Sequence, residues 1–472
     1  MKKLLHILQK SVKYYFFIFL FGVIGHEYVF SQLYPLPVLP DTTMLGRYTS
    51  RTLNLLQQST AQKRNTVKIL VYGQSISAQD WWLEVKRTIE SRFPCADLVM
   101  ENKSIGGFST QYLYKTVEMD VSSFYPDLVL LHIYGNNHYY DSVLYTIRSR
   151  TIAEIAIMTD HYIGENAWSD TMCYHILPLL AEKYKCDMIN IRDPWKQYLK
   201  DNQLEPSKLL TDGTHLNDWG NFLMAELVKP LFCFKPSYPL DPLGLQTTYK
   251  NGNDFTFQGD TLTLKFLGNK VDIILDNTHI TAGDSAKILL DGQLPSCFQG
   301  CYFMTRPYNG EGKKWPWNLP AMIRINHSQP WVTEQWSCIF TKAKAPYHDF
   351  RFKIQGSVSG VDGHGRGTRD FVSKSGKVII DKNDAEKGGD WHLNRSYRVL
   401  KTLVNNGDTV KWRTYTISKD ILVPVMKSDK TVENSITLFQ GVTNTSHVLK
   451  IIKTGVHNPP VSEIMVYKPF LN

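Results

Sequence analysis

The stretch VKILVYGQS, residues 67–75, decides the fold of this chain. Its first six residues form a short apolar run of the kind found in strands that a parallel sheet buries on both faces. Four similar runs follow, at residues 97–101, 127–134, 154–159 and 187–191. Helical stretches lie among them, at residues 81–93, 109–120, 170–185 and 219–232. This alternation predicts an α/β fold: a three-layer, doubly wound parallel sheet with helices on both faces.

The sequence pattern changes after residue 232. A proline-rich linker (Pro236, Pro239, Pro242) is followed by strands with period-two alternation and turn residues. This pattern predicts an all-β sandwich of jelly-roll type over residues 233–472. Between about 292 and 425 the alternation loosens, and we interpret that stretch as a long insertion of loops and extra strands. The α/β domain is expected at 66–232, preceded by a leader at 32–65.

The N-terminus has the pattern of a signal peptide over residues 1–31. Four lysines among the first 13 residues precede an uncharged apolar run at 14–25, with small residues placed for cleavage before Gln32. A run of this length is well below the roughly 20 residues that span a bilayer. We therefore expect no stable membrane span after processing, and a periplasmic or extracellular location in a bacterium. A retained anchor is the alternative.

Charge and cysteine usage exclude several classes of protein. The formal net charge is +9 over 472 residues, and the basic residues are scattered, so we expect no nucleic-acid partner. The seven cysteines are an odd number for an exported chain. Cys297 with Cys301, and Cys173 with Cys186, are candidate pairs. No cysteine or histidine cluster has the spacing of a zinc site, so no metal is expected.

Two of four short motifs suggest a nucleophile and its base. Ser75 directly follows the first predicted strand, at the edge where doubly wound sheets bind ligands. Asp212 precedes His215 by three residues in a predicted loop. An aspartate so placed reaches the imidazole Nδ1–H and leaves Nε2 free to take a serine proton. Either motif alone also fits an ordinary turn or helix entry.

The other two motifs suggest an oxyanion hole. Gly107 ends a glycine-containing loop after the second strand, where a residue without Cβ lets a backbone N–H approach an oxyanion. Gly106 is an alternative donor in the same loop. Asn137, after the third strand, carries an amide that donates hydrogen bonds. The order and spacing of all four motifs are more specific than any one of them.

Together these blocks resemble the SGNH (GDSL-like) hydrolase superfamily over about residues 66–232. The resemblance implies that Ser75 is the nucleophile, His215 the general base and Asp212 its partner. It also implies an oxyanion hole formed by the Ser75 and Gly107 N–H groups and the Asn137 amide. Two positions depart from the family pattern. Gln74 replaces the usual aspartate, as in the sialate and xylan acetylesterase branches, and His138 replaces an acid.

The resemblance implies a secreted serine esterase that removes O-acetyl groups from a polysaccharide or oligosaccharide by a two-step acyl-enzyme mechanism. No cofactor is needed, and an acetylated glycan is the expected partner. The later strands look like the β-sandwich modules fused to secreted bacterial carbohydrate esterases. Aromatic rings near the motifs suit flat sugar rings. We therefore take Trp81, His138, Tyr139 and Trp168 as candidate substrate-binding residues, although helix packing is an alternative for Trp81.

Other functions remain open at this point. A broad carboxylesterase or lipase uses the same residues, as does an O-acetyltransferase that excludes water. A non-catalytic glycan-binding protein that kept the fold is an alternative of a different class.

Overall fold

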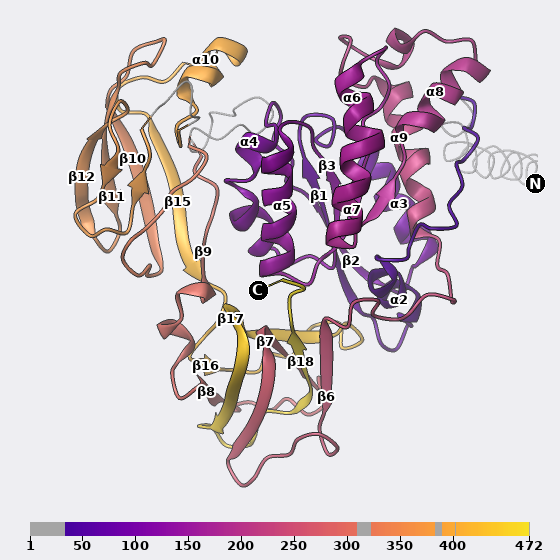
Figure 1. Cartoon of the computed structure of the whole chain (residues 1–472). Coiled ribbons are helices and arrows are strands. Elements are labelled where there is room, and N and C mark those ends of the chain that lie inside the picture. The colour runs from indigo at the N-terminus through magenta and orange to yellow at the C-terminus, as the bar shows by residue number, and fades with distance from the viewer. Residues whose placement is uncertain (1–33, 309–321, 383–388, 402, 472) are drawn as a thin grey trace, which may run out of the picture.

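The structure is a computed structural model, and it describes residues 34–308, 322–382, 389–401 and 403–471. The predicted signal peptide at 1–31 lies outside the described residues. The described chain forms an α/β part followed by antiparallel β-sheets (Figure 1). The predicted fold class, a doubly wound α/β sheet followed by an all-β part, is therefore confirmed.

The α/β part is built on a five-stranded, wholly parallel sheet in the order β2-β1-β3-β4-β5. Its strands are β1 (Thr66–Gly73), β2 (Asp97–Asn102), β3 (Leu128–His132), β4 (Glu154–Met158) and β5 (Asp187–Ile189). Each begins within one residue of its predicted start. The reversal of strand order beside β1 opens the crevice in which such sheets place their ligands.

Helices cover both faces of this sheet (Figure 1). The α-helices of this part are α2 (Ser50–Gln58), α3 (Trp81–Arg92), α4 (Thr110–Leu113), α5 (Asn137–Arg150), α6 (Ala167–Thr171), α7 (Leu177–Tyr184), α8 (Arg192–Asp201) and α9 (Asp218–Val228). Shorter helical turns are η1 (Glu118–Ser122), η2 (Met172–Ile176), η3 (Pro206–Leu209) and η4 (Lys229–Phe232). The sequence did not predict α2, α5 or α8.

The predicted helix at 109–120 is interrupted. It consists of α4 and η1, with a break after Leu113. The Leu113 carbonyl accepts hydrogen bonds from the hydroxyls of Tyr72 (3.4 Å) and Thr116 (3.2 Å). These polar contacts with the sheet and the turn replace a regular helical continuation.

Alternate residues of β1 enter two separate hydrophobic cores. Val67 and Val71 pack into one core with residues of α3 and α9. Leu70 and Tyr72 pack into the other, with residues of α5 and α7. This two-sided burial is why the strand reads as a continuous apolar run.

The β part contains two larger antiparallel sheets. One has six strands in the order β16-β8-β17-β7-β18-β6. Its strands are β6 (Gln246–Lys250), β7 (Thr261–Leu275), β8 (Ala286–Leu290), β16 (Ile421–Leu422), β17 (Asn434–Lys453) and β18 (Val461–Tyr467). The long strands β7 and β17 pair with each other through two breaks in register.

The second antiparallel sheet comes entirely from the predicted insertion at 292–425. It has the order β12-β11-β10-β15-β9, with strands β9 (Tyr302–Met304), β10 (Glu334–Lys342), β11 (Arg351–Gly356), β12 (Gly360–Arg366) and β15 (Thr409–Thr416). The insertion also holds the pair β13 (Phe371–Val372) and β14 (Ile379–Ile380), the turns η5 (Pro295–Cys297) and η6 (Gln299–Cys301), and α10 (Leu393–Leu400). Its extra strands therefore form a sheet of their own rather than loops on the sandwich.

The insertion sheet shares a core with the α/β part. Trp336, Phe340 and Trp391 belong to the same buried cluster as Phe108 and Leu113 beside α4. A second sheet is thus anchored next to the loop that follows β2, and Figure 1 shows α10 and the insertion sheet on the α4 side of the α/β part.

Among the described residues, no helix is long and apolar enough to cross a membrane. All seven cysteines are free thiols, so neither candidate disulfide pair is formed.

Candidate active site

Ser75 lies at the carboxyl end of the central strand β1, held by contacts with β3. The Gln74 N–H (3.4 Å) and the Ser77 hydroxyl (2.9 Å) both donate to the His132 carbonyl. A Cβ added to Gly73 would lie 2.0 Å from that same carbonyl oxygen, so the backbones meet here only because residue 73 is glycine. The sequence Gly-Gln-Ser therefore places the serine between the loops that follow β2 and β3.

Ser75, His215 and Asp212 form a continuous chain of hydrogen bonds. His215 Nε2 lies 2.9 Å from Ser75 Oγ, and His215 Nδ1 lies 2.8 Å from Asp212 Oδ2. The Asp212 carboxylate also accepts the backbone N–H of His215 (2.9 Å) and of Thr214 (3.2 Å). These hydrogen bonds, the backbone one from His215 foremost, lower the pKa of Asp212 to about 2. An ionised Asp212 fixes the His215 tautomer with Nε2 directed at the serine.

Two residues that the sequence analysis missed hold the His215 loop. Gln79 donates from Nε2 to the Leu216 carbonyl (2.7 Å) and accepts the Leu216 N–H at Oε1 (2.9 Å). His161 Nε2 lies 2.9 Å from the Thr214 carbonyl. Burial lowers the pKa of His161 to about 4, so its ring is neutral near pH 7 and donates from Nε2. No sequence signal distinguishes Gln79 from any polar residue near a helix start.

The Gly107 loop lies beside Ser75. The Ile105 N–H donates to the Gly73 carbonyl (2.9 Å), which ties this loop to the end of β1. Gly107 has φ of +73°, a left-handed conformation that favours glycine. Gly107 is half-buried whereas Gly106 is buried, so the geometry favours Gly107 over Gly106 as the group open to a ligand.

Asn137 begins α5 on the other side of Ser75. Its neighbour Asn136 caps that helix by accepting the His138 N–H at 2.9 Å. The exposed side-chain amide of Asn137 makes no hydrogen bond within the described part of the chain. Thr110 donates from its N–H to the Tyr134 carbonyl (2.9 Å) and from Oγ1 to the Asn136 carbonyl (3.1 Å), so the loops after β2 and β3 are joined.

The four candidate substrate-binding residues separate into two groups. Trp81 is 1% exposed, and its indole N–H donates to the Ile76 carbonyl (2.8 Å), so it is a core residue with no ring face open to a sugar. Its assignment to substrate binding is corrected accordingly. His138 is exposed, and Tyr139 stacks on Tyr114 with ring centroids 4.7 Å apart. Trp168 is exposed.

An open pocket of about 460 Å³ lies beside Asn137. Trp168 and Tyr134 meet edge to face along it, with centroids 6.2 Å apart. The lining is otherwise polar, and it consists of Ser109, Gln111, Tyr134, Gly135, Asn136, Asn137 and Trp168. Of the four predicted residues, Trp168 therefore contributes to this pocket and Trp81 does not. No group of side chains in the described segments has the composition of a metal site.

Comparison with known proteins gives structural likenesses only. No protein-family model and no curated protein matches the chain. A two-domain esterase (CEX) active on acetylated mannans, co-crystallised with mannopentaose, is 14% identical, with 89% of this chain and 95% of that chain covered and a TM-score of 0.34. Axe2, an acetylxylan esterase from Geobacillus stearothermophilus, is 18% identical over 37% of this chain and 98% of its own, with a TM-score of 0.32. The acetyl xylan esterase AlAXEase is 23% identical over 34% and 97%, with a TM-score of 0.31.

Proposed function

We propose that this protein is a serine esterase that removes O-acetyl groups from a polysaccharide or oligosaccharide. The observation that carries the proposal is the 2.9 Å contact between His215 Nε2 and Ser75 Oγ, with Asp212 on the far side of the imidazole. A serine becomes a strong nucleophile when an oriented base is within hydrogen-bond reach. Because Asp212 stays ionised, His215 is held for this task.

The proposed reaction has two steps. His215 takes the Ser75 proton as Oγ attacks the acetyl carbonyl, and then gives that proton to the departing sugar hydroxyl. His215 next takes a proton from water, which attacks the acetyl-serine; the bond to Ser75 Oγ breaks, His215 returns the proton to Oγ, and acetate leaves. The Ser75 and Gly107 N–H groups and the Asn137 amide stabilise the oxyanion in both steps, and each such donor is worth roughly 10²–10³ in rate.

The polar pocket supports a glycan as the carrier of the acyl group. Amide and hydroxyl side chains match sugar hydroxyls, and an exposed indole offers a flat apolar face to a sugar ring. Trp168 and Gln111 are such groups in the pocket beside Asn137. A pocket for a long fatty acyl chain would instead be lined by aliphatic residues. We further propose export by the segment at 1–31, with the catalytic domain at 66–232 and the β part at 233–472.

The test is acetate release by the full chain without residues 1–31. The protein is incubated with acetylated xylan, mannan and pectin and with 4-nitrophenyl acetate, beside its Ser75→Ala variant. A matched control is Ser207→Ala, which changes a serine that is exposed to solvent. We expect acetate from the wild type and the control but not from Ser75→Ala. Absence of release from every substrate by a folded wild type would overturn the proposal.

A further inference from the structure

The β part reaches the loop that carries Gly107. Arg395, in α10, donates a hydrogen bond from Nη2 to the Gly107 carbonyl. A Cβ added to Gly107 would lie 3.5 Å from that nitrogen. The guanidinium also lies over the Tyr112 ring, 4.8 Å from its centroid. A cation from the second half of the chain is therefore fixed against the loop proposed to form the oxyanion hole.

Buried contacts hold α10 in this place. The His392 ring packs against Phe108 and Tyr112, with centroids 4.6 and 5.2 Å apart. Lys115 of the α/β part lies 3.3 Å from Asp390, and their side chains are only 5% and 0% exposed. Both sets of contacts cross between the α/β part and the insertion, so the chain is anchored directly before α10, on the N-terminal side of Arg395.

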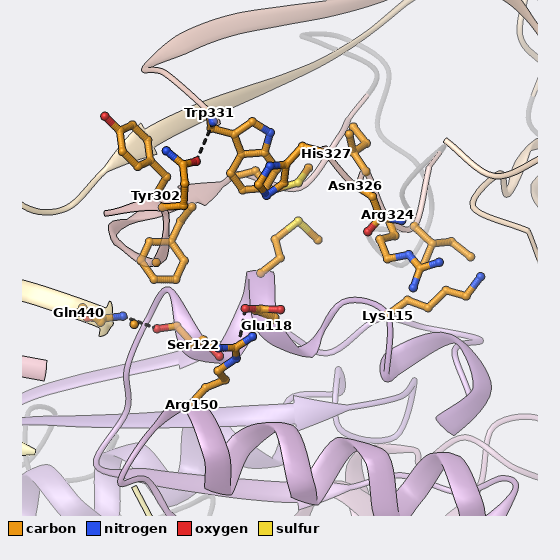
Figure 2. Close-up of a pocket in the computed structure, with 18 residues that line it drawn as sticks. Lys115, Glu118, Ser122, Arg150, Tyr302, Arg324, Asn326, His327, Trp331 and Gln440 are labelled. Atoms are coloured by element: carbon orange, nitrogen blue, oxygen red, sulfur yellow. Dashed lines mark hydrogen bonds and ion pairs between the residues drawn. The ribbon is translucent and has the colours of Figure 1, made fainter. Parts of the chain in front are cut away.

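The Asp390 carboxylate also joins the two parts through a third residue. Arg324 of the insertion lies 3.3 Å from the same Asp390 oxygen that Lys115 contacts. Figure 2 shows Lys115 and Arg324 ending near each other at one end of a cavity of about 380 Å³ between the two parts. Because Lys115 and Asp390 are buried, removal of either one is costly, and the junction is held in one arrangement.

The charge of Arg395 also acts on a residue that lines the pocket. Burial raises the pKa of the Tyr134 phenol, and the positive charge of Arg395 opposes that shift. Tyr134 lines the pocket beside Asn137. The guanidinium therefore contacts the Gly107 loop and also acts electrostatically on Tyr134 at the pocket.

Gly107 needs such an anchor. A glycine with positive φ has a backbone that rotates at little cost, since no Cβ restricts it. The Phe108 N–H is bound to the Ile105 carbonyl (3.1 Å), whereas the Gly107 carbonyl is held by Arg395. The Gly107 N–H belongs to the preceding peptide unit, so release of the carbonyl lets the φ and ψ angles of Gly107 change and with them the direction of its N–H.

We propose that Arg395 is a positioning residue of the oxyanion hole, so that the insertion at 292–425 completes the active site of the α/β domain. This inference rests on the proposed esterase function. It assigns to the insertion a direct part in the chemistry, in addition to any binding of glycan.

The test compares Arg395→Gln, Arg395→Lys and Arg395→Ala with wild type on 4-nitrophenyl acetate and on an acetylated polysaccharide. Arg398→Gln is the matched control, because Arg398 is exposed on the same helix. We expect Arg395→Gln to lower kcat about 10- to 100-fold on both substrates with little change in KM, since one oxyanion donor is worth about 10²–10³. Lysine keeps a donor and should restore part of kcat. Added guanidinium should restore part of the activity of Arg395→Ala.

The outcomes are distinguishable. A loss confined to the polysaccharide would mean that Arg395 contacts glycan, and would overturn the positioning role. A lower melting temperature with unchanged kcat would show a purely structural contact and would also overturn it. If Arg395→Gln does not fold, the Arg395→Lys and guanidinium measurements decide by the same criteria. An inactive wild type refutes the proposed function, whereas an active wild type with a fully active Arg395→Gln refutes this inference alone.

Discussion

Replacement of Gln79 by alanine should impair catalysis without touching any residue of the hydrogen-bonded triad. Gln79 makes two hydrogen bonds with the backbone of Leu216, of 2.7 and 2.9 Å, immediately after His215. Alanine removes both and leaves the Leu216 N–H and carbonyl without these partners. The His215 loop is then held by the contact between His161 and Thr214 and by the hydrogen bonds of Thr211 with the His215 carbonyl.

The expected magnitude follows from those two hydrogen bonds. Each contributes about 0.5–1.5 kcal/mol net, so Gln79→Ala should lower the free energy of unfolding by about 1–3 kcal/mol. If the same free energy is needed to reposition the imidazole in the transition state, kcat falls about 5- to 150-fold. Gln79→Glu keeps an acceptor for the Leu216 N–H but loses the donor, and its kcat should lie between those of wild type and alanine.

The assay is steady-state hydrolysis of 4-nitrophenyl acetate together with urea unfolding of the same preparations. Gln57→Ala is a matched control, because Gln57 is exposed on α2, away from the site. We expect a lower kcat with little change in KM. A kcat within twofold of wild type, despite a lower free energy of unfolding, would refute the view that Gln79 sets the position of His215.

Three further changes test other parts of the site. Asp212→Asn should lower kcat on small esters by about 10²–10³, less than the roughly 10⁴ known for a buried triad aspartate, because the Asp212 side chain is 58% exposed; an undiminished kcat would remove Asp212 from the mechanism. Trp168→Ala should raise KM for acetylated polysaccharide about 2- to 10-fold, the worth of one aromatic contact, and leave hydrolysis of 4-nitrophenyl acetate unchanged; equal effects on both substrates would contradict a role in sugar binding. Burial lowers the pKa of His392 to about 3, so the unfolded chain binds the extra proton between about pH 6.5 and 3, and the free energy of unfolding falls as pH decreases through that window. His392→Phe should make this fall smaller, as measured by urea unfolding at about pH 4 and pH 7, and an identical pH dependence in the variant would show that His392 does not contribute.

Much of the α/β fold was predictable because strands buried on both faces have continuous apolar sequences. Strand β1 reads as an unbroken apolar run since Val67 and Leu70 enter opposite cores. Helix α5 was not predicted. Its exposed side carries Asn137, His138 and other polar residues, so the helical repeat of apolar residues is weak in its sequence. The sheet formed by the insertion was also missed, because many of its buried residues belong to a core shared with a distant part of the chain.

Some residues of the candidate site could likewise be predicted from the sequence and others could not. Ser75, Asp212 and His215 could be proposed from the sequence because each stands in a short local pattern at a strand or helix boundary. Gln79 and Arg395 could not be proposed from the sequence. Each contacts a loop that is distant along the chain, and only the tertiary structure brings the residue and its loop together. Trp81 was misassigned because the choice between a buried and an exposed tryptophan depends on which helix face meets the sheet.

The contact between Gly107 and Arg395 also has a consequence for how the protein is made. The two residues are 288 positions apart, so at about 5–20 residues per second a ribosome needs roughly 15–60 s to pass from one to the other. In the later part of that interval, once residue 215 has been made, the nascent chain has the serine, the aspartate and the histidine, but not the arginine that anchors the glycine loop. The proposed esterase activity is thus expected to reach its full rate only once the last third of the chain has been synthesised and folded back onto the first.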